Sequence, residues 1–459
     1  MNIDPSIFKA YDIRGIYPEQ LDEQAAYLIG RGLVQYFKEN NLISPGQKFL
    51  VARDTRNSSP VLAAKLIEGI TDEGLDVDDL GVASTDVFLF AAGFGNYYGG
   101  VMVTASHNPP EYNGFKVISR GVEFVFDKQL QELKETMKNL TAFANHQKGQ
   151  VAQAEVTQEF LEWLKQKGRM EKLTKKFKII ADPGNGTAAE FIQEFFKMIP
   201  VVVAYINLEE NGDFPGRGPN SAKNNPVMSE KIIEMGADLG VAWDGDGDRV
   251  AFYDEKGQLL AGDVTAMLIV SQVLKENPGS TIVYDLISSK SLPGLIEKLG
   301  GKPIKSRVGR AFINRVTQEN DGLLGTELSG HYLYRTDFEQ FRSYIENTWY
   351  TLSNVLHLLQ DDGRPLSVIA ESLTKYHKGD VVIFHTDKSV RIFDELKLKY
   401  PDGNQDMLDG LTVDYGNWWF NLRPSNTEPI IKLVVEAESQ ELLDQKTAEL
   451  KSAITPLVS

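Results

Sequence analysis

Residues 176–196, which read KFKIIADPGNGTAAEFIQEFF, decide the fold. An apolar, β-branched run ends at Asp182, a turn rich in glycine follows, and apolar residues then recur with helical spacing. A strand, a tight turn and a helix together form the opening of a βα unit, which predicts a parallel or mixed sheet. The pattern therefore indicates an α/β fold.

The same layout occurs twice more along the chain. Residues 48–70 read KFLVARDTRNSSPVLAAKLIEGI, with Asp54 after the apolar run, and residues 280–300 read STIVYDLISSKSLPGLIEKLG, with Asp285 in that place. Because βα openings are common, coincidence is the alternative interpretation. We interpret the three copies as three related α/β domains.

The C-terminal part of the chain does not repeat this layout. After a helical stretch that ends near residue 360, the linker-like run DDGRPL leads to alternating strands and helices around NWWFNLRPSNTEPIIKLVVEAES. A chain of 459 residues is too long for one core and has room for roughly three or four domains. With polar, glycine-containing turns as boundaries, the predicted domains are 1–150, 151–255, 256–365 and 366–459.

Composition excludes several classes of protein. The absence of cysteine excludes disulfide scaffolds, thiol nucleophiles and thiolate metal sites. A formal net charge of -16 argues against a nucleic-acid binder, so an anionic ligand would need basic groups gathered locally. The N-terminal residues do not read as a signal peptide, and the most apolar stretch, residues 259–274, is short and carries Asp263. We therefore expect no membrane segment and a cytoplasmic location.

The first chemical motif is VMVTASHNPPEYNGFKVIS at residues 101–119. It predicts a strand followed by a stiff loop that presents Ser106, with His107 beside it, as an exposed hydroxyl. Such a hydroxyl suits a nucleophile that carries a phosphoryl group. Lys116 lies ten residues after the serine, close enough to return as a charge partner or proton carrier. A Ser–His neighbour pair is weak evidence by itself, and a plain surface turn is the alternative.

The second motif is DGDGDR, between two apolar runs that predict strands. Asp244, Asp246 and Asp248 place three carboxylates at alternate positions, which suits a hard cation, and Arg249 suits phosphate beside it. A plain acidic turn is one alternative. An EF-hand is another, with Glu255 at its twelfth position, but its sixth position requires glycine and here holds the arginine. A phosphatase with an aspartyl-phosphate nucleophile also fits the local sequence.

The third motif, LLGTELSGHYLY at residues 323–334, supplies groups suited to a sugar. Glu327 and Ser329 are good partners for sugar hydroxyls, and His331 is a residue type that titrates near neutral pH. A solvated loop is the alternative interpretation.

The fourth motif, FNLRPSNTEPIIK at residues 420–432, predicts a strand that ends in a loop rich in hydrogen-bond donors. Arginine presents a bidentate fork to phosphate, so this loop is a candidate for the local basic site that an acidic chain needs. An ordinary hairpin loop is the alternative. The candidate phosphate-binding residues are Arg423, Ser425, Asn426 and Thr427.

These four motifs, in this order, resemble the α-D-phosphohexomutase superfamily, and most closely its phosphomannomutase/phosphoglucomutase branch. The resemblance covers essentially the whole chain, from KAYDIRG at residues 9–15 to RPSNTEP at residues 423–429, and TASHNP with DGDGDR is highly specific. It implies a four-domain α/β enzyme around a central cleft, with three related mixed α/β sheet domains and a smaller α+β C-terminal domain.

The resemblance also implies an activity. The chain would interconvert hexose 1-phosphate and hexose 6-phosphate, of mannose and/or glucose, through a phosphoserine enzyme. Mg²⁺ would be the cofactor, and a hexose 1,6-bisphosphate the intermediate and activator. Hexose phosphates are the expected partners, with neither nucleic acid nor membrane, and monomer and dimer both stay open. The alternatives are phosphoglucosamine mutase or a related sugar-phosphate mutase, a metal-dependent aspartyl-phosphate phosphatase, and a non-catalytic sugar-phosphate-binding protein.

Individual roles follow from matching this sequence to the family's motifs. Ser106 matches the serine that is phosphorylated in the resting enzyme, Arg249 the arginine beside it, and Lys116 a lysine proposed for proton transfer. The expected catalytic residues are Ser106, His107, Lys116, Arg14, Arg249 and His331. The expected metal ligands are Asp244, Asp246, Asp248 and the phosphate of Ser106. The expected substrate-binding residues are Tyr11, Glu327, Ser329, His331, Arg310, Arg423, Ser425, Asn426 and Thr427.

Several positions bear on the choice of sugar. Asn426 and Leu328 stand where phosphoglucosamine mutases usually carry glycine and glutamine, which favours mannose or glucose phosphate. Ile287 stands where many relatives carry lysine or arginine, and Arg310 replaces a histidine common in the branch. After His331, FRSYIENTW replaces an Asp-Asp-Gly run that often opens a helix. These three departures leave the phosphoryl chemistry intact and leave the sugar open.

Overall fold

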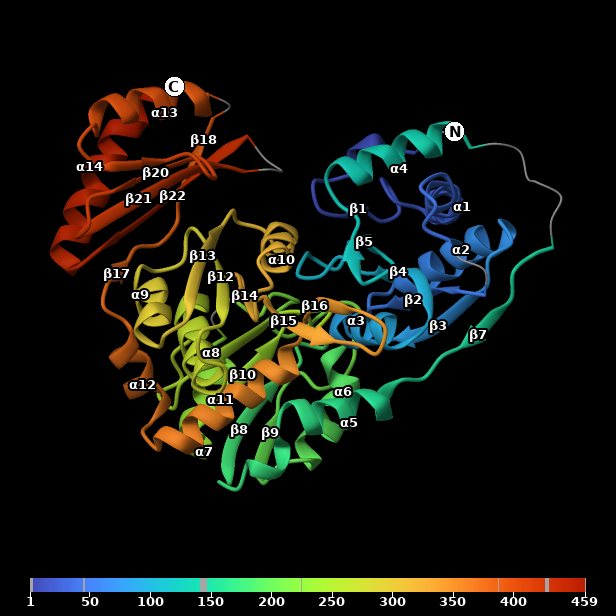
Figure 1. Cartoon of the computed structure of the whole chain (residues 1–459), viewed down its shortest axis with the longest axis horizontal. Helices are drawn as coiled ribbons and strands as arrows, with labels where there is room; N and C mark the ends of the chain where they lie inside the picture. The colour runs from blue at the N-terminus through green and yellow to red at the C-terminus, as the bar shows by residue number, and fades with distance from the viewer. Residues whose placement is uncertain are drawn as a thin grey trace. The chain divides into compact units, whose positions relative to one another are not determined.

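The structure is a computed structural model, and its elements are shown in Figure 1. The chain divides into two compact units, each formed by two segments. Unit 1 is Met1–Ala261 with Ser329–Ser367, and unit 2 is Gly262–Leu328 with Val368–Ser459. No described helix combines the length and apolar character needed to cross a lipid bilayer. The described residues are 3–43, 46–140, 147–223, 225–386, 388–425 and 429–458.

The first sheet of unit 1 has the strand order β1-β5-β4-β2-β3-β7, with β6 paired to β5. Strands β4, β2, β3 and β7 run parallel, whereas β5 is antiparallel to both β4 and β1. Helices α1, α2 and α4 enclose one apolar core with this sheet, and α3 contacts β2 and β4. The strands are β1 (Ile13–Ile16), β2 (Lys48–Arg53), β3 (Val77–Val82), β4 (Tyr97–Val103), β5 (Tyr112–Ser119), β6 (Glu123–Phe124) and β7 (Val151–Gln153). The helices are a 3-10 turn (Pro5–Ile7), α1 (Glu23–Glu39), α2 (Ser59–Asp72), α3 (Thr85–Phe94) and α4 (Lys128–Lys138).

The second sheet of unit 1 has the order β11-β10-β8-β9. Strand β8 is parallel to β9 and β10, and β10 and β11 form an antiparallel pair. A further antiparallel pair, β15–β16, leads into α11. The strands are β8 (Phe177–Asp182), β9 (Val201–Tyr205), β10 (Leu239–Trp243), β11 (Val250–Tyr253), β15 (Tyr332–Asp337) and β16 (Arg342–Glu346). The helices are α5 (Thr157–Lys167), a 3-10 turn (Met170–Lys172), α6 (Ala188–Lys197), α7 (Pro226–Met235) and α11 (Thr348–Asp362).

Unit 2 contains the parallel strands β13-β12-β14 and an antiparallel sheet of order β17-β22-β21-β20-β19, with β18 paired to β22. The strands are β12 (Thr281–Asp285), β13 (Lys302–Ser306), β14 (Leu324–Thr326), β17 (His377–Lys378), β18 (Val382–His385), β19 (Asn404–Asp406), β20 (Leu411–Asp414), β21 (Trp418–Pro424) and β22 (Ile430–Ala437). The helices are α8 (Gly262–Glu276), α9 (Ser291–Lys298), α10 (Arg310–Glu319), α13 (Ser389–Lys399) and α14 (Gln440–Val458), and α12 (Leu366–Leu373) begins in unit 1.

The three predicted βα openings are confirmed. In each, a strand (β2, β8 or β12) ends beside an aspartate and a helix (α2, α6 or α9) follows within a few residues. The three carboxylates are fully buried, and each accepts a hydrogen bond from the turn that follows it. The aspartate thus satisfies turn groups that would otherwise be buried without a partner. The bonds are Arg56 N to Asp54 Oδ1 (3.1 Å), Gly184 N to Asp182 Oδ1 (2.8 Å) and Ser288 Oγ to Asp285 Oδ1 (2.8 Å).

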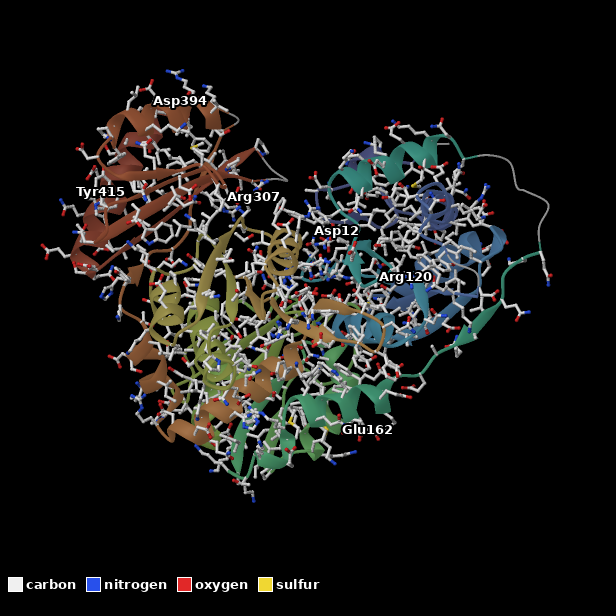
Figure 2. The ribbon with its side chains drawn as sticks, in the orientation of Figure 1. Asp12, Arg120, Glu162, Arg307, Asp394 and Tyr415 are labelled. Carbon is white, nitrogen blue, oxygen red and sulfur yellow. The ribbon has the colours of Figure 1, made fainter. Side chains whose placement is uncertain are left out.

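The C-terminal sheet differs from these openings, as the sequence predicted. Its strands are antiparallel, and α13 and α14 pack on the sheet around one apolar core. Tyr415, labelled in Figure 2, lies in the turn before β21 and stacks on Trp418 with the ring centroids 4.9 Å apart. The α/β class with a C-terminal part of another type is therefore confirmed, whereas the four domain boundaries stay a prediction.

Candidate active site

Ser106 lies in the loop after β4, in a backbone conformation that few residues adopt. Its φ is +51°, in the left-handed region, so the surrounding structure must hold the loop in place. The Ser106 backbone N–H donates to Thr104 Oγ1 (2.8 Å), and the Thr104 hydroxyl donates to Asp54 Oδ2 (2.7 Å). The aspartate of the first βα opening therefore also fixes the serine loop.

A buried arginine, Arg56, clamps the same loop. Its side chain is fully buried, its Nε donates to Asp54 Oδ2 (3.0 Å), and its four remaining bonds go to backbone carbonyl oxygens. One guanidinium thus satisfies four loop carbonyls and neutralises one carboxylate. The carbonyl acceptors are Ser106 (2.8 Å), Asn108 (2.7 Å), Pro109 (2.6 Å) and Tyr112 (3.0 Å).

The three aspartates of DGDGDR lie on the loop between β10 and β11 and are fully buried. One ligand oxygen from each of Asp244, Asp246 and Asp248 lies within 4.8 Å of the others, which suits a metal ion. The Ser106 hydroxyl donates to Asp244 Oδ2 at 3.1 Å. A Cβ at Gly245 would lie 2.8 Å from the Ser106 carbonyl oxygen, so the two loops approach this closely because a glycine stands there.

One sequence expectation changes here, and one alternative is excluded. Ser106 was expected to present an exposed hydroxyl, but it is only 1% exposed because the aspartate loop packs against it. The EF-hand interpretation is wrong, because antiparallel strands rather than helices flank the aspartates.

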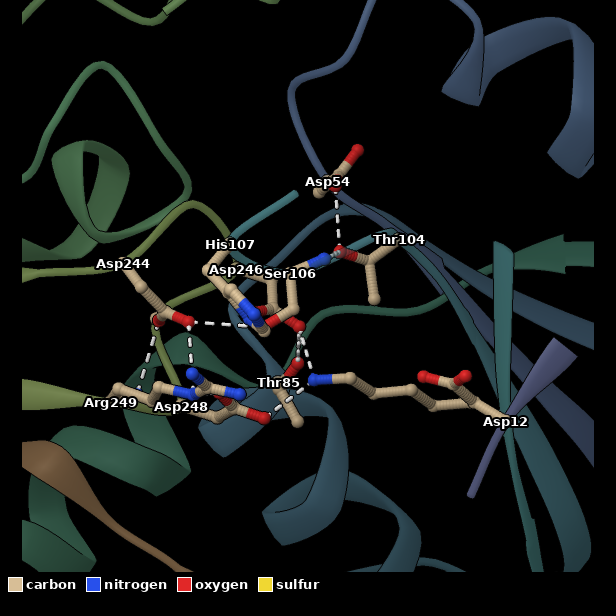
Figure 3. A network of polar contacts seen from close by, with 12 residues as sticks. Asp12, Asp54, Thr85, Thr104, Ser106, His107, Asp244, Asp246, Asp248 and Arg249 are labelled. Atoms are coloured by element: carbon tan, nitrogen blue, oxygen red, sulfur yellow. Dashed lines mark hydrogen bonds and ion pairs between the residues drawn. The ribbon is translucent and has the colours of Figure 1, made fainter. Parts of the chain in front are cut away.

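Lys116 is the counter-charge of the aspartate cluster. It lies on β5, opposite Met102 of β4, and its Nζ is 2.5 Å from both Asp246 Oδ2 and Asp248 Oδ2. Figure 3 labels these two aspartates beside Asp244 and Ser106. Burial and Asp248 raise the pKa of Asp246, but Lys116 together with the hydrogen bond from Thr85 outweighs them, so this pKa lies below its ordinary value. Burial, Asp248 and Asp246 raise the pKa of Asp244 well above its ordinary value. If all three aspartates are ionised, they carry more negative charge than Lys116 and Arg249 neutralise.

Arg249 and His331 border the cluster on the side of Asp244 and Asp248. Arg249 Nε lies 3.7 Å from Asp244 Oδ2 and donates to His331 Nε2 at 2.9 Å. Because a guanidinium can only donate, Nε2 is an acceptor, and a neutral His331 carries its proton on Nδ1. That Nδ1 is 3.5 Å from Glu346 Oε1 and 3.8 Å from Asp248 Oδ1. Asp248, His331 and Glu346 form a second buried group with metal-ligand spacing.

His107 is a neutral neighbour of the serine. Its Nδ1 lies 3.5 Å from Ser106 Oγ. Burial lowers the pKa of His107 to about 3, with the cations Arg249 and Arg14 lowering it further. His107 therefore offers an uncharged ring nitrogen to the serine hydroxyl at neutral pH.

Arg14, on β1, reaches the serine loop from the first strand of the sheet. Its Nη1 donates to Asn108 Oδ1 (2.8 Å), and its Nη2 pairs with Asp12 Oδ2. Tyr11 is half-buried just before β1. Arg14 of the KAYDIRG segment therefore lies beside the serine loop.

The predicted sugar-binding residues divide between the two units. Glu327 follows β14 in unit 2 and is buried, and its neighbour Leu328 donates its N–H to Asp285 Oδ2 (2.7 Å). Arg310, also in unit 2, is the first residue of α10. Ser329 belongs to unit 1, together with His331.

The predicted phosphate loop follows β21 in unit 2. Arg423 is half-buried on β21, and the Ser425 N–H donates to the Ile430 carbonyl (2.9 Å). Asn426 and Thr427 lie outside the described residues.

Ile287, one of the sequence departures, is a packing residue. It is 6% exposed and joins an apolar cluster with Trp419 and Val434. Lys378 from β17 donates to the Ile287 carbonyl and pairs with Asp263 Oδ2 (2.7 Å). The cation near this turn is therefore supplied from another segment.

Family models match this chain in four consecutive segments. Three are described as phosphoglucomutase/phosphomannomutase, alpha/beta/alpha domains I, II and III, and the fourth as the C-terminal domain; they match residues 5–143, 158–257, 261–376 and 390–453. A phosphomannomutase of Methanocaldococcus jannaschii is 33% identical over 458 residues, which cover 99% of this chain and 98% of the relative. The chain belongs to the phosphoglucomutase/phosphomannomutase family of the α-D-phosphohexomutase superfamily.

Other relatives agree with this membership. A phosphomannomutase/phosphoglucomutase of Pseudomonas aeruginosa is 32% identical over 451 residues, covering 96% of this chain and 93% of the relative. The crystal structure of a phosphoglucomutase/phosphomannomutase family protein from Burkholderia thailandensis superposes with a TM-score of 0.89 at 30% identity, covering 99% and 98% of the two chains.

Membership in the phosphoglucomutase/phosphomannomutase family makes this chain a hexose-phosphate mutase, an isomerase that works as an intramolecular phosphotransferase. The family's mutases are metal-dependent, and the aspartate cluster is the candidate metal site. The two alternatives from other classes, the aspartyl-phosphate phosphatase and the non-catalytic sugar-phosphate-binding protein, are therefore set aside.

Sequence reasoning missed several residues of this site. Arg56, Thr85 and Glu346 lie outside the four motifs, yet the structure places them beside the serine loop or the aspartates. Thr85 donates its hydroxyl to Asp246 Oδ2 (2.8 Å). A signal existed for Arg56 alone, because a basic residue two positions after a strand-ending aspartate is an obvious ion-pair partner.

Proposed function

We propose that this mutase interconverts the 1-phosphate and 6-phosphate of mannose and/or glucose through a phosphoserine at Ser106. The observation that carries this proposal is the placement of the Ser106 hydroxyl. It lies 3.1 Å from Asp244 Oδ2, beside a cluster of three buried carboxylates, on a loop that Arg56 holds through four carbonyls. A hydroxyl so fixed beside a candidate cation site suits a covalent phosphoryl carrier.

The aspartate cluster fits Mg²⁺. Three carboxylate oxygens within 4.8 Å of one another are the donor set that a hard cation prefers, and Lys116 with Arg249 leaves part of their charge uncompensated. The residues that would hold the ion are Asp244, Asp246, Asp248 and the phosphate on Ser106. A bound Mg²⁺ would neutralise charge on the phosphoryl group during transfer.

The transfer itself exchanges one O–P bond for another. A free hydroxyl of the hexose phosphate forms a bond to phosphorus, the bond from Ser106 Oγ to phosphorus breaks, and the hydroxyl proton moves to a base. Lys116 and His331 are the candidates for relaying that proton to the Ser106 oxygen as it leaves phosphorus, and Arg249 stabilises negative charge on the transferring group. The hexose 1,6-bisphosphate intermediate then turns end for end, and its other phosphate returns to Ser106.

Further residues are proposed to bind the substrate. Arg310 begins α10, where first-turn N–H groups and a guanidinium together favour an anion. Arg423 and Ser425, with Asn426 and Thr427, are proposed to hold the phosphate that does not react. Glu327 is proposed to accept hydrogen bonds from sugar hydroxyls, with Ser329 and Tyr11 as further substrate contacts. A cytoplasmic location is part of the same proposal.

A coupled assay over mannose, glucose and glucosamine 1-phosphates tests this function, with glucose 1,6-bisphosphate added as activator. We expect turnover of mannose or glucose 1-phosphate and slower turnover of glucosamine 1-phosphate. The Ser106→Ala variant is the matched control, because it removes one oxygen and keeps the loop bonds made by the backbone. A preference for glucosamine 1-phosphate, or a Ser106→Ala variant with parent activity, would contradict the proposal.

A further inference from the structure

A buried carboxyl group lies directly behind the aspartate loop. Asp86, in the first turn of α3, is fully buried, and its Oδ2 is 2.6 Å from both the backbone nitrogen and the hydroxyl of Thr348, which begins α11. In the described part of the chain, Asp86 Oδ1 has no hydrogen-bond partner. The charged groups that act on it most strongly, Asp248 and Glu346, are both negative. Among the described residues, no ion pair gives this carboxyl the cation that usually accompanies a buried carboxylate.

The Thr348 hydroxyl has more acceptors around it than one proton can serve. Thr348 Oγ1 accepts the Trp243 Nε1–H (3.1 Å), and it lies 2.6 Å from Asp86 Oδ2 and 3.1 Å from the Gly247 carbonyl oxygen. If Asp86 is ionised, one of these two acceptors gets no proton, because a threonine hydroxyl carries only one. With a proton on Asp86, its O–H donates to Thr348 and the Thr348 hydroxyl donates to Gly247. Every one of these contacts then has one donor and one acceptor.

We propose that Asp86 is a neutral carboxylic acid which, through Thr348, positions the aspartate loop for its metal ion. The Gly247 carbonyl belongs to the peptide bond that precedes Asp248, so the Thr348 hydroxyl sets the orientation of that peptide. Thr85, next in sequence to Asp86, holds the other side of Gly247 through its N–H to the Asp246 carbonyl (2.8 Å). Consecutive residues at the start of α3 thus fix the loop on both sides of the glycine.

The electrostatic setting agrees with a neutral Asp86. Burial raises the pKa of Asp86 well above its ordinary value, and Asp248 and Glu346 raise it further against the hydrogen bonds from Thr348. A neutral acid adds no negative charge behind three aspartates that already repel one another. Asp86 and Thr348 are therefore positioning residues, and their effect on catalysis rests on the metal site proposed above.

Mg²⁺ binding measured by calorimetry on metal-stripped protein tests the pair without turnover. Thr348→Val keeps the shape of the side chain and removes the bond to Gly247, so we expect its Mg²⁺ dissociation constant to rise about tenfold. Thr348→Ser keeps the hydroxyl and should bind as the parent does. Asp86→Asn keeps a donor toward the Thr348 hydroxyl but cannot accept the Thr348 N–H at the same position, so it should weaken Mg²⁺ binding less than Thr348→Val does. Thermal unfolding of each variant reports separately on folding.

Infrared spectroscopy provides a second measurement that needs no metal. We expect the carbonyl stretch of a buried protonated carboxyl in the parent, and its loss in Asp86→Asn. A parent protein that binds no Mg²⁺ would defeat the proposed metal site, while the infrared band would still decide the state of Asp86. The proposal is overturned if that band is absent, if Asp86→Asn weakens Mg²⁺ binding as much as Thr348→Val, or if Thr348→Val binds as the parent does.

Discussion

Replacing Arg56 by lysine should damage the serine loop while keeping the buried positive charge. The Arg56 side chain makes five hydrogen bonds, one to Asp54 and four to loop carbonyls. A lysine ammonium has three donors, so at least two buried acceptors lose their partner. Each unsatisfied buried acceptor costs about 1–3 kcal/mol, so the free energy of unfolding should fall by about 2–6 kcal/mol.

The loss of activity should exceed what unfolding explains. Two of the four carbonyls belong to Ser106 and Asn108, so the loop shifts where phosphoryl transfer is proposed to occur. A misplacement of about 1 Å can cost on the order of 10²-fold in rate, and we expect kcat to fall by about that factor in the folded variant. Urea unfolding gives the stability change, and the coupled mutase assay at saturating substrate gives kcat.

Arg31→Lys is the matched control for this substitution. Arg31, on α1, is also buried in unit 1, where it pairs with Glu73 (2.7 Å), the residue after α2. It should lower stability and leave kcat unchanged. If Arg56→Lys lost stability but kept the parent kcat, the loop would hold its catalytic geometry without the arginine, and the reasoning would fail.

Three further predictions concern the metal and the substrate. Chelation with EDTA should abolish turnover, because Asp244, Asp246 and Asp248 are proposed to hold a metal ion. Added Mg²⁺ should restore turnover. Full activity after exhaustive chelation would contradict the metal site. Glu327→Ala should lower kcat/KM by roughly one to two powers of ten, since unpaired sugar hydroxyls cost about 1–3 kcal/mol, and phosphate on Ser106 should be retained. Loss of that phosphate would show that Glu327 acts on the phosphoryl centre instead. If the Arg310 guanidinium binds phosphate, Arg310→His should raise KM for hexose phosphates. Unchanged kinetics with every substrate would show that Arg310 does not contribute to binding.

The parts of the fold that depend on contiguous residues could be predicted from the sequence. Each βα opening occupies about twenty consecutive residues, because its strand, turn and helix are neighbours along the chain. The aspartates at 54, 182 and 285 were recognised as strand ends, and each caps its turn. The C-terminal part could be distinguished from the three βα openings for the same reason, because its consecutive residues do not repeat their layout.

The parts of the site that depend on distant residues could not be predicted this way. Ser106 was expected to be exposed, but it is buried, and the aspartate loop, more than a hundred residues away, comes close to it because Gly245 has no side chain. Glu346 and Thr348 have no local signature, because a buried glutamate or threonine reads like any polar residue at a strand or helix end. Their roles come from His331 Nδ1 and from Asp86, which only the folded chain brings near them.

The central claim is that Ser106 carries the phosphoryl group, and one labelling measurement tests it most directly. Dephosphorylated enzyme is incubated with glucose 1,6-bisphosphate bearing radioactive phosphorus, and the labelled residue is identified by mass spectrometry. We predict label on Ser106, stable to acid and to hydroxylamine, transferable to unlabelled glucose 1-phosphate, and absent from Ser106→Ala. Label on an aspartate that hydroxylamine releases, or turnover without any labelled protein, would contradict the account.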